Sequence, residues 1–225
     1  MDTIKSKYLE QISGDFRLLA EIVLKEISIL RQILSAADHS SAYEEIATNE
    51  ILIDGLDVKM REEVINAIFL FNPKAMDLRK IIAYHDMTIY LERIGDLILN
   101  ISRHLRQCKL EGESFDELGK KIAQMLEFVE KMVRNAVFSF TCEDNSMAYL
   151  TISTDDKVDA LFREITAALY MNFHGKVLSS QDLQNILSIN SISYNIERIG
   201  DNATNIAEAA IYLMEGKDIR HGNKK

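Results

Sequence analysis

The chain of 225 residues has one proline, two cysteines and no tryptophan. Cys108 and Cys142 do not form a C-x-x-C motif, which excludes a disulfide framework and a cysteine-rich zinc site and favours a reducing compartment. The longest apolar run, residues 67–71, is far too short to cross a bilayer. The first residues, MDTIK, do not have the form of a signal peptide. We therefore expect a cytoplasmic protein without membrane insertion.

Positive charge is also scarce. Lysine and arginine together number 26 against 35 aspartates and glutamates, for a formal net charge of −9. No basic run with interleaved aromatic residues is present, so we expect no binding of nucleic acid. The sequence also lacks a Glu-x-x-His pair, a nucleophile elbow and a glycine-rich phosphate loop. These absences predict that the protein is not an enzyme.

The most informative feature that is present is an internal repeat. Residues 91–96 (LERIGD) return as residues 196–201 (IERIGD), and Asn-Ile follows each copy at Asn100 and Asn205. Glu92 and Glu197 are 197 − 92 = 105 residues apart. The same offset relates the acidic pair at residues 50 and 54 to the pair at residues 155 and 159. A repeat of this size indicates two copies of one supersecondary unit.

Apolar residues recur at helical spacing throughout, and no period of two competes. Six helices are predicted. The first runs from Phe16 to near Asp38, the second from a capping box of Ser41 and Glu44 to Phe71, and the third from an Asn72 N-cap and Pro73 to about Cys108. The fourth starts at a capping box of Ser114 and Glu117, the fifth runs from about Met147 to Asn172, and the sixth from near Ser180 to Gly216. We expect an all-α fold of two tandem antiparallel three-helix bundles. Their predicted domains are residues 1–110 and 114–225, with the linker at 109–114.

Acidic side chains share one face on four of these helices. In the first half they are Glu50, Asp54, Asp57, Glu92 and Asp96, and in the second half Asp155, Asp159, Glu197 and Asp201. The third and sixth helices are apolar on two sides, so we expect them to be buried and their carboxylates to need positive partners.

Two interpretations of the carboxylates remain open. Arg93 and Arg198, with Arg61 or Lys157, could form a buried ion-pair network. Alternatively, the carboxylates bind metal ions through oxygen, with Asn100 and Asn205 adding amide oxygens. The mid-helix glycines Gly95 and Gly200 predict close approach of another backbone.

Several segments resemble the PhoU family, and together they extend over nearly the whole chain. They are both LERIGD-type segments, the entry Pro73-x-x-x-Asp77-Leu78-Arg79, the stretch from Asn205 to Tyr212 and the closing Gly216-x-x-Ile219-x-His221. The resemblance implies two three-helix bundles with multinuclear metal sites, which hold iron in some members and zinc in others. Carried onto this sequence, the implied metal ligands are Glu50, Asp54, Asp57, Glu92, Asp96 and Asn100, then Asp155, Asp159, Glu197, Asp201 and Asn205.

The resemblance also implies a function. PhoU-like proteins restrain phosphate uptake and silence the phosphate-starvation response when phosphate is plentiful. They contact the ATPase subunit of the phosphate ABC transporter and the phosphate-sensing histidine kinase. We expect a non-enzymatic regulator of this kind, and a homodimer formed through apolar outer faces of the third and sixth helices. The alternative is a helical metal-buffering or metal-storage protein. A metal-dependent hydrolase ranks third because no general base or nucleophile stands out.

Three positions depart from the family pattern. Tyr90 precedes the first Leu-Glu-Arg, Phe162 stands where the repeat places Asp57, and the second half has Asp-Leu-Gln at 182–184 in place of the Asp-Leu-Arg entry. The two metal sites are therefore predicted to be unequal, with fewer or more weakly held ions in the second half.

Overall fold

The computed structural model describes residues 2–35, 40–74, 76–108 and 113–216, and these residues form helices without strands. The helices are α1 (Asp2–Ser35), α2 (Ser40–Phe71), α3 (Met76–Gln107), α4 (Glu113–Thr141), α5 (Asn145–Phe173) and α6 (Ser180–Glu215). The shortest helices have 29 residues and the longest has 36, so the helices are about 45 to 55 Å long. The prediction of an all-α fold with six long helices is confirmed.

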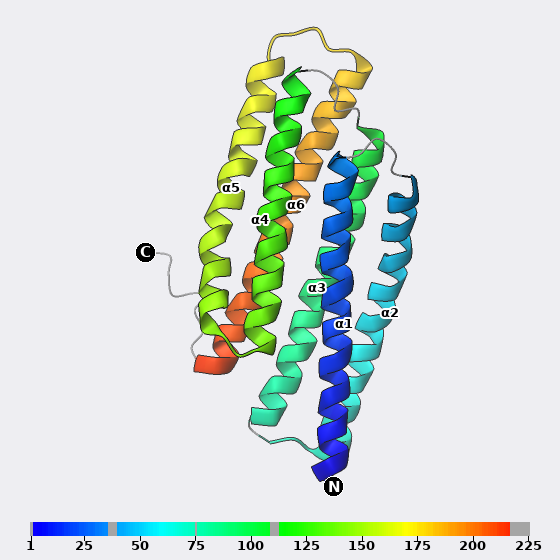
Figure 1. Cartoon of the computed structure of the whole chain (residues 1–225), viewed down its shortest axis with the longest axis vertical. Helices are drawn as coiled ribbons and strands as arrows, with labels where there is room; N and C mark the ends of the chain where they lie inside the picture. Colours follow the sequence, from blue (N-terminus) through cyan, green and yellow to red (C-terminus); the bar gives the residue numbers. More distant parts are fainter. Residues whose placement is uncertain (1, 36–39, 75, 109–112, 217–225) are drawn as a thin grey trace.

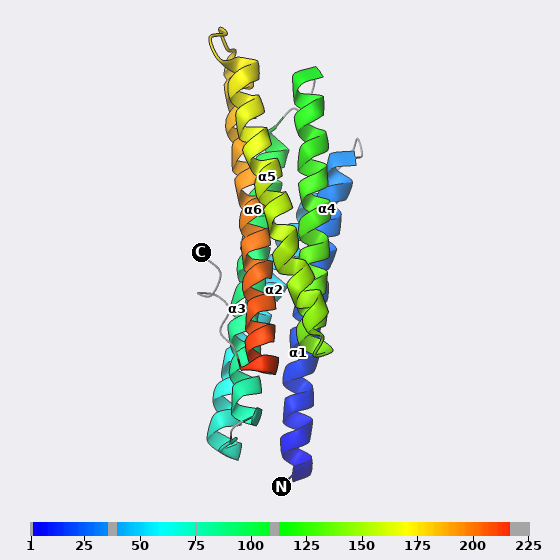
Figure 2. The ribbon, with the colours of Figure 1, turned by 90° about the vertical axis from the view of Figure 1, so that its left-hand side faces the viewer.

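Two bundles of three helices lie side by side. Lobe one consists of α1, α2 and α3, and lobe two of α4, α5 and α6; within each lobe every helix packs against the other two. Figure 1 shows α2 and α5 at opposite edges, with the remaining helices between them. Figure 2 shows that the lobes are displaced relative to each other along the long axis. The start of α1 and the connection of α5 to α6 lie at opposite ends of the molecule.

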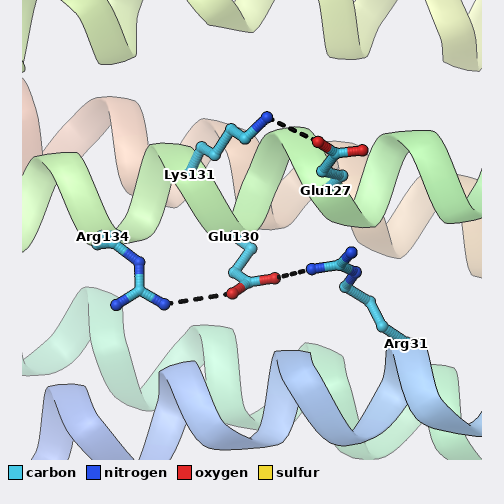
Figure 3. A network of polar contacts seen from close by, with 5 residues as sticks. All are labelled: Arg31, Glu127, Glu130, Lys131 and Arg134. Atoms are coloured by element: carbon cyan, nitrogen blue, oxygen red, sulfur yellow. Dashed lines mark hydrogen bonds and ion pairs between the residues drawn. The ribbon is translucent and has the colours of Figure 1, made fainter.

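The lobes join through two helix pairs, α3 with α6 and α1 with α4. Phe16, Tyr84 and Phe140, from α1, α3 and α4, pack edge to face with ring centroids 4.7 to 5.4 Å apart. Near the surface, Arg31 of α1 and Arg134 of α4 both bind the carboxylate of Glu130, at 2.6 and 3.2 Å (Figure 3). α3 and α6, whose apolar outer faces we expected to form a homodimer interface, pack against each other within one chain. The homodimer stays a prediction.

Several helix starts differ from the prediction. α1 begins at Asp2, α2 at Ser40 and α4 at Glu113, so Ser41 and Ser114 lie inside the first turn and are not N-caps. The α2–α3 connection differs most, because α3 begins at Met76 and not at Pro73. Asn72 has a positive φ of 42°, and its N–H donates to the carbonyl of Ile68 at 3.1 Å. Asn72 therefore terminates α2 and does not cap α3.

The boundaries of lobe two agree better. Ser179 caps α6 and exchanges hydrogen bonds with Asp182, and the N–H of Gly216, at a φ of 69°, donates to the carbonyl of Tyr212 at 2.9 Å. Left-handed backbone of this kind favours glycine, which explains why the helix ends there. Most of the predicted linker, residues 109–112, and the closing residues Ile219 and His221 lie outside the described residues.

Candidate metal centres in the two lobes

Acidic cluster one is formed by Glu50, Asp54 and Asp57 of α2 with Glu92 and Asp96 of α3. Burial raises the pKa of Glu50 to about 7, helped by its contact with Asp96 and by the charges of Asp54 and Glu92. Burial also raises the pKa of Glu92, and Asp96, Asp57 and Asp54 repel its charge further. The predicted side chains therefore do come together across the α2–α3 contact.

Cluster one has a buried side and a side open to solvent. Glu50 and Asp57 are 8% and 6% exposed, whereas Asp54 and Asp96 are exposed. Oε2 of Glu50 and Oδ1 of Asp57 are buried and have no hydrogen-bond partner within the described residues. Buried acceptors without a donor are costly.

Gly95 of α3 lies directly against this cluster. A Cβ placed on Gly95 would lie 3.1 Å from Oε2 of Glu50 and 2.9 Å from Cδ1 of Ile53. The glycine allows a carboxylate and an isoleucine of α2 to pass close to α3. The predicted close approach exists, but it is made by side chains and not by another backbone.

Acidic cluster two repeats the arrangement with Asp155 and Asp159 of α5 and Glu197 and Asp201 of α6. Burial and then the charge of Asp201 raise the pKa of Asp155 to about 6 and that of Glu197 to about 7. The pKa of Asp201 is raised by burial and by Asp159. A Cβ on Gly200 would lie 3.2 Å from Oδ1 of Asp155, as Gly95 does with Glu50 in lobe one.

The two asparagines lie one turn beyond these clusters, and both are half-buried. Asn100 follows Asp96 on α3, and its side-chain oxygen accepts a hydrogen bond from Nη1 of Arg103 at 3.3 Å. Asn205 follows Asp201 on α6. Their contribution to a metal site stays a prediction.

The alternative interpretation, a buried ion-pair network, is realised only at the edges. Within the described residues, the ion pairs that reach the clusters are Arg61 with Asp57 at 2.9 Å and Arg163 with Asp159 at 3.8 Å, and both arginines are largely exposed. The other predicted cations lie over aromatic rings: Arg93 over Tyr90, Arg198 over Tyr194 and Lys157 over Phe128, each about 6 Å from the ring centroid. The pKa values of Glu50, Asp155 and Glu197 are raised despite these cations.

The residues present fit a metal ion in chemical type but are not drawn together around one point. Among the described residues, no three histidine, cysteine, aspartate or glutamate side chains converge closely enough to hold an ion. The donors are all oxygens, and among the described residues Oε2 of Glu50 and Oδ1 of Asp57 lack a hydrogen-bond partner. Burial and the charges of neighbouring carboxylates raise the pKa values of Glu50 and Glu92. Such a donor set suits a hard cation or iron.

Sequence reasoning missed one acidic residue, Glu26 of α1. Its side chain is fully buried, and burial together with the charge of Glu50 raises its pKa to about 9. The available signal was its spacing, because Leu19, Val23 and Leu30 form an apolar stripe whose missing member is position 26.

The fold and these clusters define a class: an all-α protein of two repeated three-helix bundles, each with carboxylates between its second and third helices. The PhoU domain family matches the chain twice, at residues 16–105 and 122–210. These copies start 122 − 16 = 106 residues apart and end 210 − 105 = 105 residues apart, in agreement with the repeat.

The similarity to known proteins extends over almost the whole chain. A phosphate-specific transport system accessory protein PhoU homolog of Aquifex aeolicus is 32% identical over 220 residues, covering 97% of this chain and 96% of that protein. A homolog of the same name from Pseudomonas putida is 30% identical over 213 residues, covering 95% and 81%. The chain belongs to the PhoU family.

Solved structures agree with this assignment. The crystal structure of PhoU from Pseudomonas aeruginosa superposes with a TM-score of 0.83 at 28% identity, over 94% of this chain and 99% of that one. The phosphate transport system regulatory protein PhoU from Streptococcus pneumoniae gives a TM-score of 0.82 at 20% identity, over 96% and 99%, and shows the fold. No helix among the described residues is long and apolar enough to cross a membrane.

Proposed function

We propose that this protein regulates phosphate uptake and phosphate-starvation signalling, without catalysis, by contact with the ATPase subunit of a phosphate ABC transporter and with a phosphate-sensing histidine kinase. The observation that carries the proposal is the match of both repeats to the PhoU domain, together with relatives named as accessory proteins of phosphate-specific transport.

A regulator that acts by contact needs exposed surface that another protein can cover. α2, at one edge of the molecule (Figure 1), exposes Ile51, Val58, Ile65 and Phe69 by 58 to 83% on one side of the helix. The positions 105 residues later are Asp156, Arg163 and Tyr170 of α5 and His174, which directly follows this helix. Exposed apolar stripes often mark protein interaction sites, so the outer face of α2 supports action by contact.

Metal binding is the second part of the proposal. Clusters one and two would hold iron or zinc ions through their carboxylate oxygens, with Asn100 and Asn205 as amide donors. A bound cation would neutralise the repelling carboxylates and so stiffen the contact between the second and third helix of each lobe. Because the carboxylates are not gathered around one point, binding requires rotamer changes of the exposed members, such as Asp54 and Asp96.

The test is phosphate uptake in phosphate-replete medium, in the host strain and in a strain that lacks this chain. We expect uptake to be deregulated and the starvation response to be switched on without the chain, and the wild type to restore both. Rescue with Asp96→Asn and Asp201→Asn then reports whether the acidic clusters are needed.

The alternative function, metal buffering or storage, is favoured by the raised pKa values of the clustered carboxylates. It predicts that the metal content of the protein follows the metal supply while phosphate uptake is the same with and without the chain. Unchanged uptake, in a host without a second copy of the gene, would therefore reject the regulator and favour the buffer.

A further inference from the structure

Glu26 has no evident role in the two-helix acidic motifs. It lies on α1, is 0% exposed, and neither of its carboxylate oxygens has a hydrogen-bond partner within the described residues. A carboxyl group buried in this way lowers stability unless something compensates for it. A buried glutamate at this position therefore needs a chemical explanation.

The position of Glu26 can be judged from its copy in lobe two. The first helices of the lobes are related by 106 residues, which places Met132 of α4 at the equivalent point. Cε of Met132 lies 3.6 Å from the place where a Cβ on Gly200 would stand, and Oδ1 of Asp155 lies 3.2 Å from the same place. A side chain from the first helix therefore reaches the glycine beside the carboxylate of the second helix.

In lobe one the same point is surrounded by carboxylates. Oε2 of Glu50, without a hydrogen-bond partner among the described residues, is 3.1 Å from the Cβ position of Gly95, and the charge of Glu50 acts on Glu26. Glu26 therefore lies close enough to Glu50 of cluster one for the two charges to interact. Two buried carboxylates from different helices, both with oxygens unpaired among the described residues, are donors of the type that a cation uses.

Packing alone does not account for a carboxylate here. Met132 fills the equivalent position in lobe two and is fully buried, without any polar group. A glutamate is close to methionine in length, so its chemical difference is the pair of oxygens. Those oxygens are the part of the side chain that a cation would use.

We propose that Glu26 is a further ligand for a divalent cation in lobe one, so that α1, α2 and α3 all hold the ion, whereas lobe two supplies carboxylates from α5 and α6 only. This inference rests on the metal-binding part of the proposed function and specifies its ligands. It also gives lobe one the tighter site, because an additional charged oxygen ligand raises affinity for a hard cation.

The experiment isolates lobe one. The full chain carrying Asp155→Asn and Asp201→Asn is stripped of metal with a chelator and titrated calorimetrically with Mn²⁺ and, separately, with Zn²⁺. Glu26→Met and Glu26→Gln are then made in this background. Glu21→Gln is the matched control, because Glu21 is an exposed glutamate of the same helix. Thermal melting of each metal-free variant checks folding, and Glu26→Met is expected to fold because lobe two carries methionine at this point.

We expect both Glu26 variants to weaken binding about tenfold or more, as loss of a metal-site partner does, and Glu21→Gln to bind like its parent. Equal affinity in the parent and both Glu26 variants would overturn the role of Glu26 and leave metal binding intact. If the parent binds neither ion while the lobe-two carboxylates are absent, and wild type also binds neither, metal binding itself is wrong and the Glu26 proposal is rejected with it. If only wild type binds, lobe one is no site, which also rejects the role of Glu26.

Discussion

The two lobes share a plan and differ in polarity. Each places a glycine of its third helix against a carboxylate of its second helix, at Gly95 with Glu50 and at Gly200 with Asp155. Around this shared contact the remaining positions differ. The first helix contributes Glu26 in one lobe and Met132 in the other, and Asp57 corresponds to Phe162, which packs near the ring of Tyr194.

A surface ion pair also shows that equivalent positions of the two lobes can carry side chains of opposite charge. Lys59 of α2 binds Asp15 of α1 at 2.7 Å, and 105 to 106 residues later Glu164 of α5 binds Lys121 of α4 at 2.6 Å. The positions are repeated and the charges are exchanged. The repeat therefore preserves the positions at which the helices contact each other, whereas the polarity of the side chains at these positions differs between the lobes. Lobe one has more carboxyl groups inside, because Glu26 and Asp57 take the positions of Met132 and Phe162.

The largest effect is expected from exchanging the residues of the first helices. In metal-free protein, Met132→Glu buries a carboxyl group without a partner and should lower the free energy of unfolding by about 3 kcal/mol or more. Glu26→Met should raise it, because an apolar side chain replaces a buried carboxyl group. Urea unfolding with chelator present measures both. Two changes of the same sign would contradict the difference between the lobes.

The next effect is the dependence of stability on pH. The pKa of Glu50 and that of Glu197 rise from 4.5 to about 7, and the pKa of Glu26 rises to about 9. A raised folded-state pKa means that the folded protein keeps protons that the unfolded chain releases, so stability falls as pH increases from about 4.5 through these values. Metal-free protein should melt at a lower temperature at pH 7 than at pH 5, and lower again at pH 9.

Glu26→Met sharpens this prediction by separating the contribution of Glu26 from those of Glu50 and Glu197. The loss of stability between pH 7 and pH 9 belongs to Glu26 and should largely disappear in the variant. The loss between pH 5 and pH 7 should become smaller, because Glu26 also contributes there, and the part due to Glu50 and Glu197 should remain. A melting temperature that rises from pH 5 to pH 7 in the metal-free wild type would contradict the burial of these carboxylates.

A smaller effect is expected at the two glycines. Alanine in mid-helix gains about 1 kcal/mol over glycine in propensity. At Gly95 the new Cβ would lie 2.9 Å from Cδ1 of the buried Ile53, and overpacking of this kind costs about 1 to 3 kcal/mol. Gly95→Ala should therefore destabilise by about 1 kcal/mol, whereas Gly200→Ala, with its nearest contact at 3.2 Å, should be neutral or slightly stabilising. Equal denaturation midpoints would show that the two contacts are equally tight.

The smallest effect concerns the exchanged ion pair. Lys59 contacts Asp15 and also lies 3.7 Å from Glu63, which is only 6% exposed, whereas Glu164 contacts Lys121. Lys59→Met should cost more than Glu164→Gln, although both changes should stay within about 1 kcal/mol because the pairs face solvent. Thermal melting at low and high salt compares them. A larger cost for Glu164→Gln would reverse the comparison.

Much of this organisation can be predicted from the sequence. The 105-residue repeat and the helical spacing of apolar residues specify six helices and two bundles, and the acidic pairs predict which carboxylates meet. The start of α3 was mispredicted because Asn72-Pro73 fits an N-cap pattern, whereas the chain uses Asn72 to end α2 with a positive φ. Local patterns describe one helix end at a time, and a short connection can satisfy only one of them.

The contacts between helices that are distant along the chain could not be predicted from the sequence. The apolar faces of α3 and α6 indicated a contact surface, but their pairing within one chain depends on how the lobes pack. Glu26 was overlooked because a single acidic residue in an apolar stripe resembles a surface position until α2 is placed against it. The direction of Arg93 and Arg198, over tyrosine rings and not toward the carboxylates, is a choice of rotamer that spacing does not determine.

The central claim is that the carboxylates between the second and third helices of each lobe are unequal cation sites. The most direct measurement is the metal content of protein purified without chelator, for wild type, Asp96→Asn and Asp201→Asn. We predict iron or zinc in the wild type, less metal in each variant, and the larger loss for Asp96→Asn because lobe one holds its ion more tightly. Wild-type protein without iron, zinc or manganese would contradict the claim.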